Sequence, residues 1–108
     1  MPLYMLQFAY SPEAWAALVR KPEDRTAAVD AIAKSVGGRL LSLYFHMGEF
    51  DGTIILEAPD DAAANAAIMA TVASGAIRSS RTTRLYSSKE LMETLGKAGK
   101  VSYRPPGK

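Results

Sequence analysis

Runs of apolar residues predict four strands along the chain. Residues Leu3–Tyr10 are apolar apart from Gln7, and a Ser-Pro pair ends the run, as expected for a strand buried on both faces. Three further strands are predicted at Gly38–Gly48, Thr53–Ala58 and Ala76–Tyr86. The last of these alternates β-forming residues with Arg and Ser, which suits a sheet edge that is exposed on one side.

Helical spacing and capping residues predict helices between and after these strands. Ser11 is a good N-cap for a helix that begins at Pro12, and Gly37-Gly38 ends a second helix. Asp60 caps an alanine-rich third helix whose small side chains let it lie close to a sheet. Ser87 and Glu90 have the spacing of a capping box. The second to fourth helices are expected from Pro22 to about Val36, from about Asp61 to Ala73, and over Leu91–Leu95 and a little beyond.

The order of these elements predicts an α+β, ferredoxin-like βαββαβ fold with an extra C-terminal helix. Two right-handed crossovers joined by a hairpin give an antiparallel sheet with its helices on one face, and the first and third strands at its centre. We expect residues 1–98 to form one domain and residues 99–108 to form a flexible basic tail.

The apolar character of both faces of the central strands predicts self-association. Helices cover only one face of a four-stranded sheet, yet the first strand offers Leu3 and Met5 on one side and Leu6 and Phe8 on the other. An uncovered face of this kind would be a larger apolar patch than monomers usually expose. We therefore expect a homodimer packed sheet to sheet, a dimeric α+β barrel, with assembly beyond the dimer left open.

Composition narrows the classes of partner and chemistry. The chain has 108 residues, 48% of them hydrophobic and 22% charged, and it contains no cysteine, which rules out disulfides and thiolate chemistry. No apolar run approaches the ~20 residues of a membrane helix, and the start lacks a signal-peptide pattern. We expect a cytoplasmic protein with no membrane partner, no cofactor and no metal.

Positive charge is concentrated in the C-terminal third of the chain. From Arg78 onward the chain contains eight Lys or Arg residues and only two Glu. Such a basic segment could contact nucleic acid. Aromatic residues are not interleaved with these charges as a base-stacking surface requires. A solvated strand edge followed by a basic tail is therefore the preferred interpretation, and nucleic acid is not an expected partner.

The hairpin Leu40–Leu56 carries the candidate catalytic residues His46, Tyr44 and Asp51. Strict alternation places Leu41, Leu43, Phe45 and Met47 on one face of its first strand, and Leu40, Ser42, Tyr44 and His46 on the other. His46 is the only histidine and is a candidate general base. A plain hydrogen-bonded histidine is the competing interpretation.

The turn Gly48–Gly52 and the first strand supply the candidate ligand-binding residues Tyr4, Phe50 and Glu49. Glu49 and Asp51 could stand at the mouth of a cavity, and Tyr4 could line the helix-free face near Tyr44. The structural alternatives are glycines that permit positive φ, an aspartate that bonds its own turn, and a core tyrosine.

Several segments, taken in order, resemble the GYD-domain family. They are the Tyr-rich first strand, Gly37–Leu40, Met47–Asp51, Leu56–Asp61 and Arg84–Ser87, and the resemblance covers about residues 3–95. The family signature is usually Gly-Glu-Tyr-Asp, whereas this chain has Phe50 at the aromatic position. The resemblance implies a dimeric ferredoxin-like fold and little about chemistry.

Three functions remain open at the level of sequence. The preferred hypothesis is a small homodimeric protein that binds an apolar or aromatic small molecule between sheet and helices. The second is a cofactor-independent monooxygenase or isomerase with His46 as base, which rests on analogy of fold. The third is a structural or interaction module.

Overall fold

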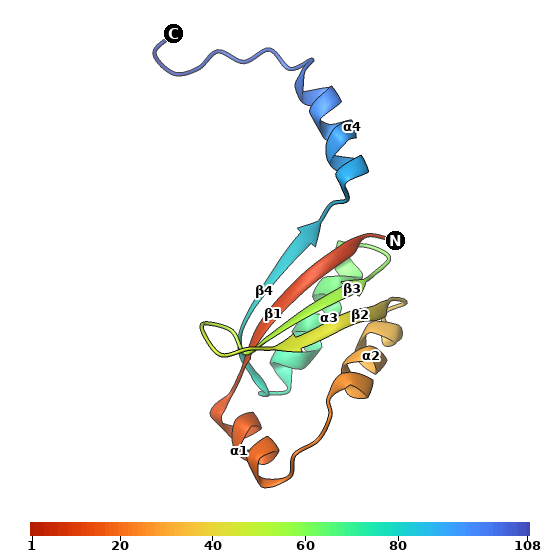
Figure 1. The fold of residues 1–108 in the computed structure, drawn as a ribbon, viewed down its shortest axis with the longest axis vertical. Helices are drawn as coiled ribbons and strands as arrows, with labels where there is room; N and C mark the ends of the chain where they lie inside the picture. The colour runs from red at the N-terminus through yellow and green to blue at the C-terminus, as the bar shows by residue number, and fades with distance from the viewer.

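The computed structural model describes residues 1–108 as a four-stranded antiparallel sheet with four helices (Figure 1). The strands are β1 (Leu3–Tyr10), β2 (Arg39–Phe45), β3 (Gly52–Glu57) and β4 (Ile77–Leu85). The helices are α1 (Pro12–Arg20), α2 (Thr26–Ser35), α3 (Asp61–Ala73) and α4 (Ser88–Ala98). The strand order β2-β3-β1-β4 confirms the α+β ferredoxin-like architecture, with β1 and β3 central and β4 at an edge.

Three of the four helices begin at the caps that the sequence predicts. The Ser11 hydroxyl accepts from the Ala14 N–H at 3.2 Å, and the Asp60 carboxylate accepts from the Ala63 N–H at 2.8 Å. Ser87 and Glu90 form the full capping box, each side chain accepting from the other residue's N–H at 3.0 Å. Each cap satisfies an N–H group that the first helical turn leaves without a partner.

The second helix begins later than predicted, at Thr26 and not at Pro22. The Asp24 carboxylate accepts from both the N–H and the hydroxyl of Thr26, at 2.9 and 2.7 Å, and so sets the start of α2. Residues 21–25 therefore form a non-helical connection that separates α1 from α2. As Figure 1 shows, α1 lies beyond one end of the sheet, whereas α2 and α3 cover one of its faces.

The predicted faces of β2 are wrong, because the strand contains a bulge. The pairing with β3 slips between Leu40 and Ser42, so Leu40, Leu43 and Phe45 share the helix-covered face while Ser42 and Tyr44 lie on the other. Strict alternation fails because a bulge inserts one extra residue, here Leu41, into one strand of the pair. The strand also ends at Phe45, which leaves His46 and Met47 in the connection to β3.

The glycines at the two ends of that connection do not adopt the positive φ that the sequence suggests. Gly52 is required for space, because a Cβ at this position would overlap the aromatic ring of Phe8 on β1. A Cβ on Gly48 would meet no atom within 4 Å. The hairpin thus depends on close packing of β3 against β1 at Gly52.

The core lies between the sheet and the helices. It comprises Tyr4, Leu6, Phe8 and Tyr10 of β1, Ile54 and Leu56 of β3, and Ala58 and Ala64. The alternate residues of β1, Leu3, Met5 and Gln7, face the uncovered side and are only half-buried. The first strand therefore has one fully buried face, not two.

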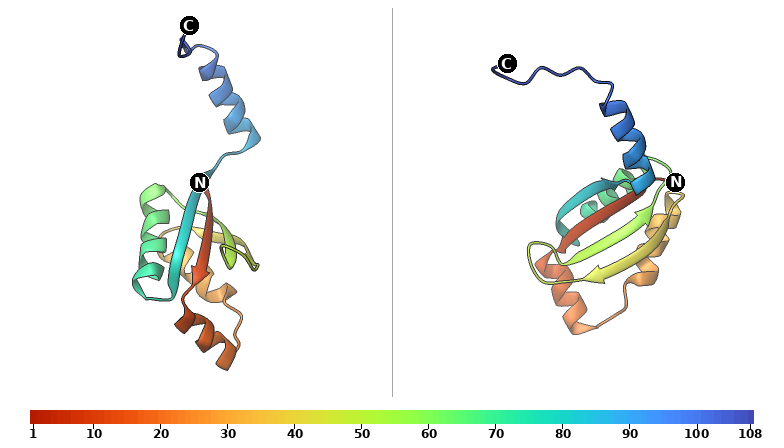
Figure 2. Two further views of the ribbon diagram at one scale, coloured as in Figure 1. Left: turned by 90° about the vertical axis from the view of Figure 1, so that its left-hand side faces the viewer. Right: turned by 45° about the horizontal axis from the view of Figure 1, so that its top comes forward.

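Helix α4 projects away from the sheet, and residues 99–108 extend further still (Figure 2). Three apolar residues of α4 are exposed: Leu91, Met92 and Leu95. Their spacing places them on the same side of the helix. None of the four helices has the length and apolar character that crossing a bilayer requires.

Candidate functional site

A cavity of about 360 Å³ lies between the sheet and helices α2 and α3. Of the 16 residues that line it, 13 are hydrophobic. Its floor is formed by Leu6, Phe8 and Tyr10 of β1 with Ile54 and Leu56 of β3. Its size falls within the range of about 300–1,000 Å³ that is common for small-molecule sites.

Small side chains on the helices explain why this space stays unfilled. Ala33 of α2 and Ala67 and Ala70 of α3 line the cavity, and each contributes only a methyl group. Ala64, one turn earlier on α3, is fully buried against the core. Helix α3 therefore packs closely on the sheet near Ala64, as the alanine pattern predicts, and leaves room nearer its C-terminal end. Protein interiors are otherwise packed with few voids larger than a water molecule.

The polar groups of the cavity have distinct roles. The hydroxyl groups of Thr71 and Ser74 donate to backbone carbonyls of α3 at 2.8 and 2.6 Å. Arg25 is the only charged residue in the lining. Burial raises the pKa of the Tyr10 phenol, and the positive charge of nearby Arg25 opposes that rise. Tyr10 therefore keeps its proton at neutral pH and can donate a hydrogen bond.

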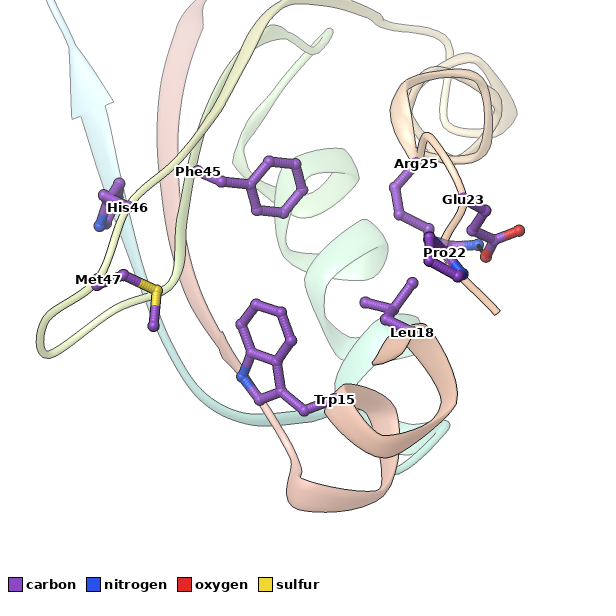
Figure 3. Close-up of a pocket in the computed structure, with 8 residues that line it drawn as sticks. All are labelled: Trp15, Leu18, Pro22, Glu23, Arg25, Phe45, His46 and Met47. Carbon is purple, nitrogen blue, oxygen red and sulfur yellow. Dashed lines mark hydrogen bonds and ion pairs between the residues drawn. The ribbon is translucent and has the colours of Figure 1, made fainter. Parts of the chain in front are cut away.

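A second, more open groove of about 430 Å³, here called the outer groove, lies beside the cavity (Figure 3). Arg25 lines both spaces. Trp15 and Leu18 of α1 and Phe45 of β2 line the groove. The Tyr10 ring packs against both aromatic neighbours, with its centroid 5.2 Å from that of Trp15 and 6.4 Å from that of Phe45. Tyr10 thus stands between the groove and the cavity.

Asp51 ties the β2–β3 connection to the junction of β1 and α1. Its carboxylate oxygen Oδ2 accepts from the Tyr10 N–H at 2.9 Å and from the Trp15 indole N–H at 3.2 Å. Its own N–H donates to the Phe8 carbonyl at 2.7 Å. The residue is buried, so these bonds satisfy polar groups that water does not reach.

His46 and Tyr44 lie together at the helix-free side of the sheet. The His46 Nε2 atom is 2.7 Å from the Thr53 hydroxyl oxygen, and Thr53 pairs with Tyr44 across β2 and β3. In Figure 3 the His46 ring lies across the strand from Phe45. The Asp51 carboxylate is bonded to Tyr10 and Trp15, so its hydrogen bonds do not orient the imidazole.

Glu49 and Phe50 contact Arg81 of the edge strand β4. The Glu49 carboxylate is 3.8 Å from the Arg81 guanidinium, which lies 5.4 Å from the centroid of the Phe50 ring. Phe50 is buried but is not part of the core cluster beneath the helices. These contacts fold the turn toward β4.

Tyr4 faces the helices as a buried core tyrosine, the structural alternative, and does not lie on the helix-free face near Tyr44. It pairs with Leu56 and Arg84, and its hydroxyl donates to the Asp61 carboxylate at 2.5 Å. That hydrogen bond raises the pKa of the Tyr4 phenol. The register explains this placement, because the core side of β1 begins at Tyr4 and continues through Leu6 and Phe8.

None of the six residues singled out from sequence lines the cavity between sheet and helices, and of the six only His46 borders the outer groove. The polar groups at the cavity belong to Arg25, Thr71 and Ser74 and to the phenol of Tyr10, whose ring is counted with the hydrophobic lining. None of these four residues is among the six. The one usable signal is an arginine directly before an amphipathic helix and three residues after a helix-breaking proline. That signal is common on protein surfaces and gains meaning only from the cavity beside it.

The fold resembles solved structures at low sequence identity. MtbAldR matches with a TM-score of 0.55 and 13% identity over 81% of this chain, and this chain spans about half, 52%, of that one. The protein TTHA0845 from Thermus thermophilus matches with a TM-score of 0.52 and 10% identity, over 82% of this chain and 96% of that one. These likenesses concern the fold alone. No curated protein matches the chain.

The GYD domain matches residues 4–95, which include all four strands except the first residue of β1, Leu3, and the helices α1, α2 and α3. The match contains every residue that lines the cavity, and the turn with Phe50. It stops within α4. The chain therefore belongs to the GYD domain family.

Proposed function

We propose that this protein binds an apolar small molecule in the cavity between the sheet and helices α2 and α3. The observation that carries the proposal is the lining, in which 13 of 16 residues around about 360 Å³ are hydrophobic. Replacing water in such a space with an apolar ligand is favourable, at about 25 cal/mol for each Å² of apolar surface removed from water. The aromatic rings of Phe8 and Tyr10 in the lining suit an aliphatic or an aromatic body.

A fluorescence titration with the uncharged probe N-phenyl-1-naphthylamine tests this proposal. Wild-type protein is expected to enhance the probe's emission in a saturable way. Ala67→Leu, on the buried side of α3, adds bulk to the cavity and is expected to weaken probe binding about tenfold or more. Ala66→Leu, at an exposed position of the same helix outside the lining, is the matched control and is expected to bind as wild type does.

Thermal unfolding distinguishes a blocked cavity from a damaged fold. A side chain that fills a real void is expected to hold or raise the melting temperature of Ala67→Leu. Equal probe affinity in wild type and Ala67→Leu, with both proteins folded, would contradict the proposal.

We further propose that two copies associate through the helix-free face of the sheet. Leu3 pairs with Leu85, and Met5 pairs with Ile55, so four half-buried apolar side chains adjoin on that face. Leu85 ends β4 shortly before α4, which carries Leu91, Met92 and Leu95 as a second exposed apolar surface. A second copy carries the same two surfaces and would cover both, which a two-fold arrangement allows.

A further inference from the structure

Arg25 is the one residue that lines both the cavity and the outer groove. It stands directly before Thr26, the first residue of α2, and its side chain is about one-third exposed, at 35%. Its side chain makes no capping hydrogen bond to the helix. The guanidinium is therefore free of a structural role in starting α2.

The present partner of Arg25 is the carboxylate of Glu23. The guanidinium nitrogen lies 2.8 Å from the Glu23 oxygen, and the Glu23 side chain is 55% exposed. Exposed pairs of this kind contribute little to stability, because water competes for both groups. The neighbouring Asp24 carboxylate is already bonded to Thr26. Another carboxylate could therefore replace Glu23 at small cost.

The groups around Arg25 suit an anion attached to an apolar body. No acidic residue lines the cavity, and the hydroxyls of Thr71 and Ser74 are bonded to backbone carbonyls. Tyr10 lies in the same lining and retains its phenolic proton, so it supplies an O–H donor close to the guanidinium. An arginine fork and one hydroxyl match the two oxygens of a carboxylate.

We propose that the cavity takes an amphipathic ligand with an apolar body and a single carboxylate, which pairs with Arg25 in place of Glu23. The apolar body lies between β1 and α3, and the carboxylate points toward the α1–α2 connection, where the groove opens to solvent. This inference rests on the proposed function and adds the ligand's charge to it. Arg25 is then the residue that distinguishes an acid from an alcohol of equal length.

The test compares decanoate with decanol as competitors that displace N-phenyl-1-naphthylamine from the full-length protein. Decanoate is expected to displace the probe from wild type at a concentration about tenfold lower than decanol, because a charge-assisted hydrogen bond forms only with the acid. Arg25→Gln is expected to remove that preference, so that decanoate displaces the probe at no lower a concentration than decanol does. Arg20→Gln is the matched control, because it removes the same charge from an exposed position of α1 outside both lined spaces.

Glu23→Gln provides a test in the opposite direction. It removes the competing carboxylate, so decanoate is expected to bind a few-fold more tightly while decanol stays as in wild type. Raising the salt concentration should weaken the binding of decanoate and not that of decanol, because salt screens the partly exposed pair between the ligand carboxylate and Arg25.

Each outcome separates this inference from the function on which it rests. Equal competition by decanoate and decanol in wild type, or an unchanged preference in Arg25→Gln, overturns the role of Arg25 while probe binding preserves the proposed function. An equal loss of decanoate preference in Arg20→Gln also overturns it, because the effect would then follow net charge alone. Absence of probe binding to wild type overturns both.

Discussion

At the scale of single residues, Asp51 joins three segments that are distant in sequence. One carboxylate oxygen accepts from Tyr10 and Trp15, which are 41 and 36 residues away. The residue sits in a turn that also contains Glu49 and Phe50, yet only Asp51 turns its side chain to the start of α1. Its chemistry in this structure is that of a buried hydrogen-bond acceptor.

Replacing Asp51 with alanine is expected to lower the free energy of unfolding by about 2–3 kcal/mol. The change leaves the Tyr10 N–H without its partner at a buried position, which costs more than the lost bond alone. Urea denaturation measures the loss. Glu49→Ala is the control, because Glu49 is exposed and its contact with Arg81 is a surface pair at 3.8 Å, so a change within about 0.5 kcal/mol is expected. Equal losses in the two variants would contradict the assignment.

The two glycines of the same hairpin give a second contrast at this scale. Gly52→Ala places a methyl group against the Phe8 ring and is expected to cost about 1–3 kcal/mol, as overpacking of a core does. Gly48→Ala meets open space at an ordinary φ and is expected to be neutral or slightly stabilising. Denaturation midpoints of the two variants check the difference, and the reverse order would refute it.

At the scale of elements, the structure depends on how α2 is joined to β2. Asp30 on α2 accepts from the Leu40 N–H at 3.1 Å and pairs with Lys34 at 2.7 Å. Leu40 stands where β2 bulges, so this bond holds the start of the strand against the helix. The same helix provides the cavity wall and begins beside Arg25.

The Asp30 contact predicts a dependence of stability on pH. The hydrogen bond with Lys34, and then that with Leu40, lowers the pKa of the Asp30 carboxyl. Its stabilising effect is therefore complete above the unfolded-state pKa of about 3.9 and is lost as pH falls through the lower folded-state pKa. Asp30→Asn is expected to flatten the acid limb of the stability curve below about pH 4. Denaturation of wild type and Asp30→Asn between pH 7 and pH 2 measures the fall in stability with acid. An equal fall in the two proteins would exclude a contribution from Asp30.

At the scale of the whole molecule, apolar surface is distributed unevenly. Figure 2 shows helices on one face of the sheet, and no element of the chain over the other face or along α4. Both of these uncovered parts carry apolar residues. Exposed apolar surface that extends over two elements is a feature of association sites.

Light scattering after size-exclusion chromatography tests the proposed dimer. Wild type is expected at twice the chain mass at micromolar concentration. A variant with Leu91→Ser and Leu95→Ser is expected to shift toward the monomer with an unchanged sheet signal in circular dichroism. Lys89→Ser with Lys97→Ser, on the charged positions of the same helix, is expected to remain dimeric. A monomeric wild type would contradict the proposal.

The residue pattern alone predicts the order of the elements, the helix caps at Ser11, Asp60 and Ser87, and the central places of β1 and β3. These depend on local hydrogen bonding and on apolar periodicity, which neighbouring residues specify. Only the folded chain shows the bulge at Leu40–Ser42, the partners of Asp51, and the cavity that Tyr10 and Arg25 both line. Each of these depends on how closely separate elements approach, which is set by the packing of side chains far apart in the sequence.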